Sequence, residues 1–134
     1  VSSTLAAYNV VYNPASGSEG LDTDSVVFIC NTLDGDNIGG DGIKQVRSTD
    51  GYILNNIVYV WTNGISTTTQ QPRCVQPHNL TNSNTTDYTP ANGTETKFSN
   101  ITSAPAFTDE AGDDYRPSSS SPAVDAQLKP GGIT

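Results

Sequence analysis

Basic residues are scarce in this sequence, which has six Lys and Arg against 14 Asp and Glu and a formal net charge of −8. Proteins contact nucleic-acid phosphates and anionic membrane surfaces through Lys and Arg, so this composition argues against both kinds of partner. Long apolar runs are also missing. The longest, Val26 to Cys30, has five residues and is far too short to span a bilayer. We therefore expect no nucleic-acid partner and no membrane insertion.

Helix-forming residues are the next scarcity. Met is absent and Leu is rare, whereas Thr, Ser, Asn, Gly and Pro are abundant, which is the reverse of helical usage. A length of 134 residues indicates one domain, which we expect to be all-β. The Ser/Thr/Asn-rich, Lys-poor composition suits an extracellular or virion protein. Because Val1 opens directly into a strand-like stretch without an initiator Met, we expect a processed product or part of a longer chain.

A repeat with a period of about 22 residues runs through the chain from Val1 to Thr81. Gly-Leu or Gly-Ile pairs recur at this period, and single asparagines recur beside β-rich stretches at nearly the same spacing. The pairs are Gly20-Leu21, Gly42-Ile43 and Gly64-Ile65, and the asparagines are Asn9, Asn31, Asn56 and Asn79. Short strands with Gly turns at one fixed period are typical of a solenoid. The repeat predicts a parallel β-helix whose coils stack about 4.8 Å apart.

Each part of the repeat has an expected structural role. An inward asparagine in every coil can hydrogen-bond to the backbone of its neighbours and satisfy polar atoms inside the stack. Glycine at the other corner is expected to supply a positive φ. Val11, Leu33 and Val58 are predicted to form one interior row. The alternation of side chains along a strand then directs Tyr59 and Trp61 outward.

The C-terminal part carries three recognisable motifs, which are Ala104-Pro105-Ala106-Phe107-Thr108-Asp109, Gly112-Asp113-Asp114-Tyr115-Arg116 and Ser121-Pro122-Ala123-Val124-Asp125-Ala126. They resemble the closing segment of secreted right-handed parallel β-helix proteins of the pectate-lyase-like superfamily. The stretch from Asp50 to Tyr59 is similar to an ordinary coil of that group. Pro117 and Gln127 depart from the pattern, where an aliphatic residue and a glycine are usual.

The repeat and the resemblance together predict a single domain with three parts. Residues 1–81 form three to four coils of a right-handed parallel β-helix, residues 82–97 form a polar loop, and residues 98–134 form an irregular cap. Phe98, Phe107 and Tyr115 are expected to cover the open C-terminal end of the last coil.

Candidate residues for chemistry are few. The resemblance implies a lyase in which Lys44 and Arg47 would take a proton α to a uronate carboxyl and neutralise that carboxyl; the alternative is a solvated strand face. His78, the sole histidine, is expected in a turn or the core more than in catalysis. A glycosidase needs two positioned carboxyl groups, and no spacing singles out such a pair.

Two acidic turns offer oxygen ligands at short spacing, as Ca²⁺ requires. Asp34, Asp36 and Asp41 are the first candidate set, and Glu110, Asp113 and Asp114 form a second acidic turn. Neither turn has a complete EF-hand or nonapeptide pattern, and an ordinary polar turn is the alternative. Calcium is the one cofactor that the sequence suggests.

Three aromatic residues, Tyr12, Tyr59 and Trp61, could form an outward surface. Such a surface would stack on a sugar ring or pack in a protein interface. Burial beneath a loop is the alternative.

The only two cysteines, Cys30 and Cys74, are separated by two repeat lengths and therefore by two coils. Stacked positions two coils apart are separated by about 9.6 Å, beyond disulfide reach. A bridge would require residues 66–77 to fold back over the coils. An oxidising environment would favour the disulfide, so the bridged and the free states of the two cysteines both stay open. The sequence also contains four sequons that would suit surface N-glycosylation in a eukaryotic source, at Asn79, Asn84, Asn92 and Asn100.

The features together favour a non-catalytic extracellular structural module, a subunit or portion of a fibre, appendage, virion spike or surface assembly. Its uncovered N-terminal edge would join another copy or an upstream part of the chain, because solenoid ends need covering and free strand edges pair readily. The alternatives are the C-terminal portion of a polysaccharide lyase or glycoside hydrolase, and a glycan-binding surface.

Overall fold

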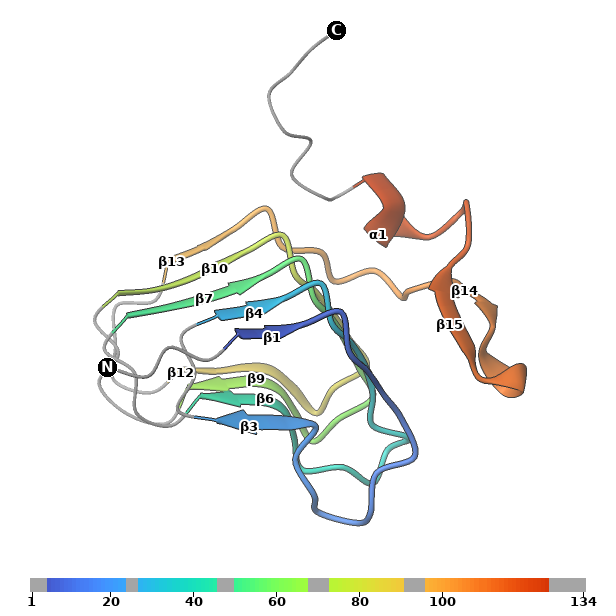
Figure 1. The fold of residues 1–134 in the computed structure, drawn as a ribbon, viewed down its shortest axis with the longest axis horizontal. Helices are drawn as coiled ribbons and strands as arrows, with labels where there is room; N and C mark the ends of the chain where they lie inside the picture. The colour runs from blue at the N-terminus through green and yellow to red at the C-terminus, as the bar shows by residue number, and fades with distance from the viewer. Residues whose placement is uncertain (1–4, 24–26, 46–49, 68–72, 91–95, 126–134) are drawn as a thin grey trace, which may run out of the picture.

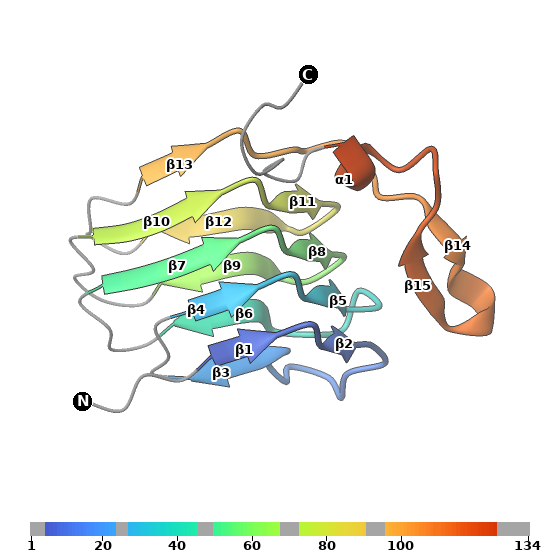
Figure 2. The same ribbon diagram turned by 45° about the horizontal axis from the view of Figure 1, so that its top comes forward.

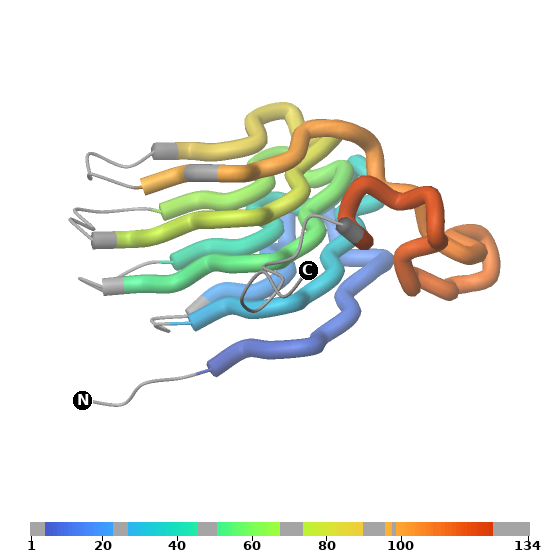
Figure 3. The backbone as a smooth tube through the Cα atoms, turned by 90° about the horizontal axis from the view of Figure 1, so that it is seen from above, coloured from blue at the N-terminus to red at the C-terminus, as the bar shows by residue number. Residues whose placement is uncertain are grey.

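The computed structural model describes residues 5–23, 27–45, 50–67, 73–90 and 96–125. The chain winds as a three-sided coil, with one strand of each coil in each of three parallel sheets of five, four and four strands (Figure 1). In the view of Figure 1 the chain runs clockwise from β1 to β3. Figure 3, which shows the molecule from above, places β1 on the side nearest to the viewer of Figure 1 and the later coils behind it. This winding is right-handed, so the predicted right-handed parallel β-helix is confirmed.

Four coils contribute a strand to every sheet, and β13 begins a fifth. Sheet A contains β1 (Leu5–Ala7), β4 (Val27–Ile29), β7 (Asp50–Leu54), β10 (Arg73–Pro77) and β13 (Thr96–Phe98). Sheet B contains β2 (Val10–Val11), β5 (Thr32–Asp34), β8 (Ile57–Tyr59) and β11 (Leu80–Asn82). Sheet C contains β3 (Leu21–Thr23), β6 (Asp41–Gln45), β9 (Asn63–Thr67) and β12 (Thr86–Pro90). Residues 82–97, predicted as a loop, therefore continue the coils through β12 and into β13.

A column of asparagines runs along the corner between sheets A and B. The backbone N–H of each of the first four asparagines donates to the Oδ1 of the asparagine one coil further on, over 2.8 to 3.0 Å. The column comprises Asn9, Asn31, Asn56, Asn79 and Asn100. In the first three, Nδ2 donates to the same oxygen over 2.9 to 3.0 Å. The predicted ladder is confirmed, and a fifth member extends it.

The residue before each ladder asparagine adopts the left-handed conformation, with φ between 54° and 57°. These residues are Tyr8, Cys30, Asn55, His78 and Ser99. The conformation turns the chain from sheet A into sheet B and recurs in every coil. His78 therefore occupies a turn, as predicted.

The interior is built from aligned apolar rows. Phe28 and Ile53 pair in sheet A, and Ile43 and Ile65 pair in sheet C; all four are buried. In sheet B, Val11 pairs with Leu33 and Leu33 pairs with Val58. The predicted row of these three residues is confirmed. Stacked coils therefore bury side chains that one coil would leave in water.

The repeated glycines have a role that differs from the predicted one. Gly20, Gly42 and Gly64 do not have positive φ, and Gly17 is the only described glycine that does. A Cβ on Gly42 would collide with Val58 Cγ1, lie 2.8 Å from the Gly64 carbonyl oxygen and lie 3.1 Å from the Trp61 ring. The prediction that these glycines supply a positive φ was wrong. Glycine is needed at these positions because the corner leaves no space for a side chain.

The C-terminal segment also differs from its prediction as an end cap. It forms an antiparallel pair of β14 (Phe107–Asp109) and β15 (Asp114–Pro117), joined by the 3₁₀ turn η1 (Glu110–Gly112) and followed by α1 (Pro122–Asp125). We call residues 107–117 the hairpin. It lies beside the coils, next to sheet B, rather than across the end of the stack (Figure 2). No helix in the described ranges has the length and apolarity needed to cross a membrane.

Candidate functional site

The hairpin packs on a column of outward side chains on sheet B. Because Val11, Leu33 and Val58 are aligned, the next residues, Tyr12, Asp34 and Tyr59, also lie one above another. The ring of Tyr115 lies 5.2 Å from that of Tyr12 and 5.3 Å from that of Phe107. Phe107 in turn lies 6.3 Å from Tyr59. Apolar ring surface on sheet B explains why the hairpin binds here and not at the end of the stack.

This packing corrects the predicted aromatic surface. Tyr12 and Tyr59 contact protein rings, and Trp61 is only 1% exposed, so the three do not form an open platform. Trp61 turns inward because Val60, at φ 54°, interrupts the strand alternation between Tyr59 and Trp61. The predicted outward position of Trp61 was wrong, whereas the outward position of Tyr59 is confirmed.

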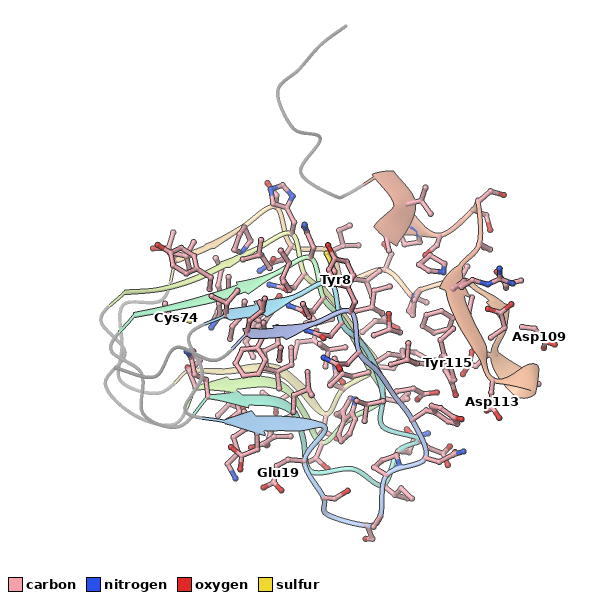
Figure 4. All side chains as sticks on the ribbon, in the orientation of Figure 1. Tyr8, Glu19, Cys74, Asp109, Asp113 and Tyr115 are labelled. Carbon is pink, nitrogen blue, oxygen red and sulfur yellow. The ribbon has the colours of Figure 1, made fainter. Side chains whose placement is uncertain are left out.

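An acidic hollow of about 530 Å³ lies where the hairpin meets the coils. Its lining includes Asp34 and Asp36 from the coil and Glu110, Asp113 and Tyr115 from the hairpin. Figure 4 labels Asp113 and Tyr115 on the hairpin. Burial and then the nearby Asp34 carboxylate raise the pKa of Glu110. Burial and then the nearby Asp34 carboxylate also raise the pKa of Tyr115. The two acidic turns, far apart in sequence, therefore share one site.

The predicted calcium ligands Asp34 and Asp36 both line the hollow, but the third, Asp41, does not. Asp41 begins β6, where its Oδ1 accepts a 2.6 Å hydrogen bond from Asn63 Nδ2. Asp114 pairs with Arg116 at 2.6 Å, which lowers its pKa to about 2. In the ranges that the structure describes, no three His, Cys, Asp or Glu side chains form a metal-binding group.

The candidate lyase residue Lys44 lies on the outer side of sheet C. Its Nζ forms a 2.7 Å ion pair with Glu19, a contact that raises the pKa of Lys44 and lowers that of Glu19. Arg47 lies outside the described residues. The geometry of Lys44 is that of a surface ion pair between neighbouring coils.

The cysteines do not form a disulfide, so the bridged alternative is wrong. Residues 73–77, which would have had to fold back, instead pair as β10 with β7. Cys74 is buried, with Sγ 3.5 Å from Gln45 Oε1 and 3.6 Å from Gln76 Nε2. Cys30 occupies a turn two coils earlier, so the coil spacing keeps the thiols apart.

The described asparagines of the sequons make hydrogen bonds within the coils. Asn79 is fully buried and Asn100 accepts its N–H, so the amide of Asn79 is closed to a glycan, and that prediction was wrong. Asn84 accepts from the Trp61 N–H at 2.8 Å and donates to the Val58 carbonyl at 3.0 Å. Asn92 lies outside the described residues.

The N-terminal end of the stack is apolar and open. We call β1, β2 and β3, with their inward residues Ala6, Val11 and Leu21, the N-terminal edge. Each strand is the outermost of its sheet, and the three inward residues pack against the core while remaining partly exposed. Asn9 is exposed, and no described residue donates to its Oδ1. Among the described residues, these three strands therefore have no strand partner on their outer side, and the ladder acceptor of Asn9 has no donor.

The C-terminal end of the stack is polar. Buried Gln76 and Thr81, together with Tyr88, replace the apolar rows of the preceding coils. Lys97 pairs in register with inward-facing Gln76, and its Nζ lies 4.7 Å above the centre of the Tyr88 ring. Burial raises the pKa of Tyr88 to about 12. Lys97 is exposed at this end, and a charge at an inward position of an edge strand opposes further pairing.

Lys97 was not among the predicted site residues, because residues 82–97 were assigned to a loop. One signal was available in the sequence: Asn100 follows Asn79 at nearly the repeat length. Extending the repeat by that one step would have placed Lys97 on a strand three residues before a ladder position.

The fold defines the class of the molecule as a right-handed parallel β-helix. No family model, curated protein or solved structure matches the chain. The resemblance to the pectate-lyase-like superfamily therefore remains a prediction from the motifs.

Proposed function

We propose that the chain is a non-catalytic structural module of an extracellular assembly, such as a fibre, appendage, virion spike or surface layer. In that assembly it closes the C-terminal end of a β-helical column. The observation that carries this proposal is the difference between the two ends: inward Ala6, Val11 and Leu21 at one, and inward Lys97 over Tyr88 at the other.

The free strand edges support an assembly role. Unpaired N–H and C=O groups on an edge strand are a template for pairing with another chain. The N-terminal edge offers three such strands around a partly exposed apolar interior. Solenoids require covered ends, and no described residue covers the N-terminal edge.

The non-catalytic part of the proposal is supported by the contacts of the polar groups. Asp34 accepts a hydrogen bond from the backbone N–H of Asp36, Lys44 pairs with Glu19, and Asp114 pairs with Arg116. Each of these groups is therefore already paired within the protein. The extracellular setting rests on the Ser/Thr/Asn-rich composition alone.

Immunogold electron microscopy of native material tests the proposed role. An antibody against the hairpin should label one end of a column, because a closing module has no successor. Regular labelling along the column would contradict the closing role, and recovery of the protein only as a separate monomer would contradict assembly.

An enzyme assay tests the rival function. Ultraviolet absorbance of unsaturated uronates, measured with polyuronate substrates, should not rise when the purified chain is added. A rise that scales with protein concentration would overturn the non-catalytic assignment and favour a lyase.

A further inference from the structure

We infer that the N-terminal edge binds a parallel β-coil that is not a second copy of this chain, and that this coil has apolar inward side chains and an asparagine at its ladder position. The inference rests on the proposed function and specifies the partner. The ladder, the interior rows and the opposite end of the stack each restrict what can bind.

The ladder has a direction that fixes the orientation of the partner. Each asparagine donates through its backbone N–H to the Oδ1 of the asparagine in the following coil, as Asn9 does to Asn31 at 3.0 Å. The vacant position in this series is the acceptor Oδ1 of Asn9. A coil preceding Asn9 must therefore present donors, and a parallel coil with its own ladder asparagine supplies both a backbone N–H and an Nδ2.

The interior rows fix the chemistry of the partner's inward side chains. Ala6 pairs with buried Phe28, Val11 with buried Leu33, and Leu21 with buried Ile43. On their other side, Ala6, Val11 and Leu21 face the position that a preceding coil would occupy. Apolar side chains stacked there would be removed from water, whereas a charge would be desolvated without a partner.

A second copy of this chain does not meet these requirements. Head-to-tail stacking would place Lys97 against the apolar rows of the next copy, at the desolvation cost of an inward charge. Head-to-head stacking would place one Asn9 acceptor against the other, with no donor from the ladder. The occupant is therefore a β-coil with an apolar interior and not a second copy of this chain.

The direct test uses a synthetic coil as the probe. A labelled, reduced peptide of residues 27–45, which contains a ladder asparagine and apolar inward residues, is titrated with the intact protein and followed by fluorescence anisotropy. We expect saturable one-to-one binding. The matched peptide with Asn31→Leu should bind about tenfold more weakly, because it loses ladder donors worth about 1 kcal/mol each.

Two protein variants locate the binding site. Ala6→Lys places a charge at an inward position of β1 and should abolish peptide binding. Leu5→Lys places the same charge at the adjacent, 64% exposed position and should leave binding within about twofold of wild type. Thermal unfolding of both variants checks the fold. Asn9→Leu provides a second disruption, which removes the acceptor and should weaken binding severalfold.

The outcomes are decisive for the partner. Equal binding of the two peptides, or undiminished binding to folded Ala6→Lys, would overturn the inference. Concentration-dependent filaments of the wild-type chain alone in sedimentation velocity would show that a second copy is the occupant, which also overturns it. These results are separate from the immunogold result, which reports membership of an assembly and not the chemistry of the edge.

Discussion

Tyr115 of the hairpin and Asp34 of the second coil line the same acidic hollow, where burial and then the Asp34 carboxylate raise the pKa of Tyr115. Asp34 is only 6% exposed although it lies on the outer side of sheet B, because the hairpin covers it. Asp34 Oδ1 accepts a hydrogen bond from the backbone N–H of Asp36 at 3.1 Å. A carboxylate shielded in this way is stabilised by a nearby hydroxyl that donates to it, so we predict that the Tyr115 hydroxyl stabilises Asp34.

Tyr115→Phe tests this contact directly. The change keeps the ring contacts with Tyr12 and Phe107 and removes only the hydroxyl, so we expect a loss of about 1–3 kcal/mol in the free energy of unfolding, measured with urea. Asp34→Asn in a double-mutant cycle isolates the pairwise contribution. Additive effects of the two changes would contradict a direct bond.

Glu110 gives the hairpin a defined pH response. Burial and Asp34 raise the pKa of Glu110 above its usual 4.5, so the folded protein binds this proton more tightly than the unfolded chain does. Its contribution to stability is present in acid and is lost as pH rises through the raised pKa. Glu110→Gln should therefore be more stable than wild type at neutral pH, and the difference should shrink on acidification.

Urea unfolding at several pH values measures that difference. Asp22→Asn, an exposed carboxyl change on β3 away from the hollow, is the control and should not reproduce the pattern. A difference in the free energy of unfolding between Glu110→Gln and wild type that grows on acidification would contradict a raised pKa of Glu110 caused by burial and Asp34.

The asparagine column should be far more sensitive in the middle than at its open end. Asn56→Leu removes a buried amide whose Nδ2 binds Asn79 Oδ1 at 3.0 Å and whose Oδ1 accepts from Asn31. Leaving several buried groups unpaired should cost about 3 kcal/mol or more. Asn9→Leu, the same change at an exposed position, should cost about 1 kcal/mol. Equal losses in urea unfolding would contradict the buried ladder.

Gly42 is predicted to tolerate no side chain. The added methyl of Gly42→Ala would meet Val58, the Gly64 carbonyl and Trp61, so overpacking should cost about 1–3 kcal/mol. Gly17→Ala is the matched control, since nothing lies within 4 Å of its Cβ and only its φ of 74° is unfavourable. The near-ultraviolet signal of Trp61 should change in Gly42→Ala and not in Gly17→Ala.

The stack itself could be predicted because its determinants repeat locally. Asn9, Asn31, Asn56 and Asn79 mark the coils at nearly constant spacing, and apolar Leu33 and Val58 follow at a fixed offset. Parallel coils convert equal spacing in sequence into vertical alignment in space. The ladder and the interior row therefore follow from the repeat length and the period-2 alternation of strands.

The site could not be predicted to the same extent, because it depends on turns and on distant contacts. One left-handed residue, Val60, sends Trp61 inward where simple alternation directs it outward. The hairpin reaches Asp34 across more than three coils of sequence, and no local pattern encodes that return. The two acidic turns were identifiable separately, but their meeting required the fold.

Hydrogen–deuterium exchange tests the central claim most directly, by comparing the free chain with the same chain in its native assembly. Backbone amides of β1, β2 and β3 should become more protected in the assembly, while those of β12 and β13 should exchange as they do in the free chain. New protection at β12 and β13, or no change at the N-terminal edge, would contradict a module that is open at one end and closed at the other.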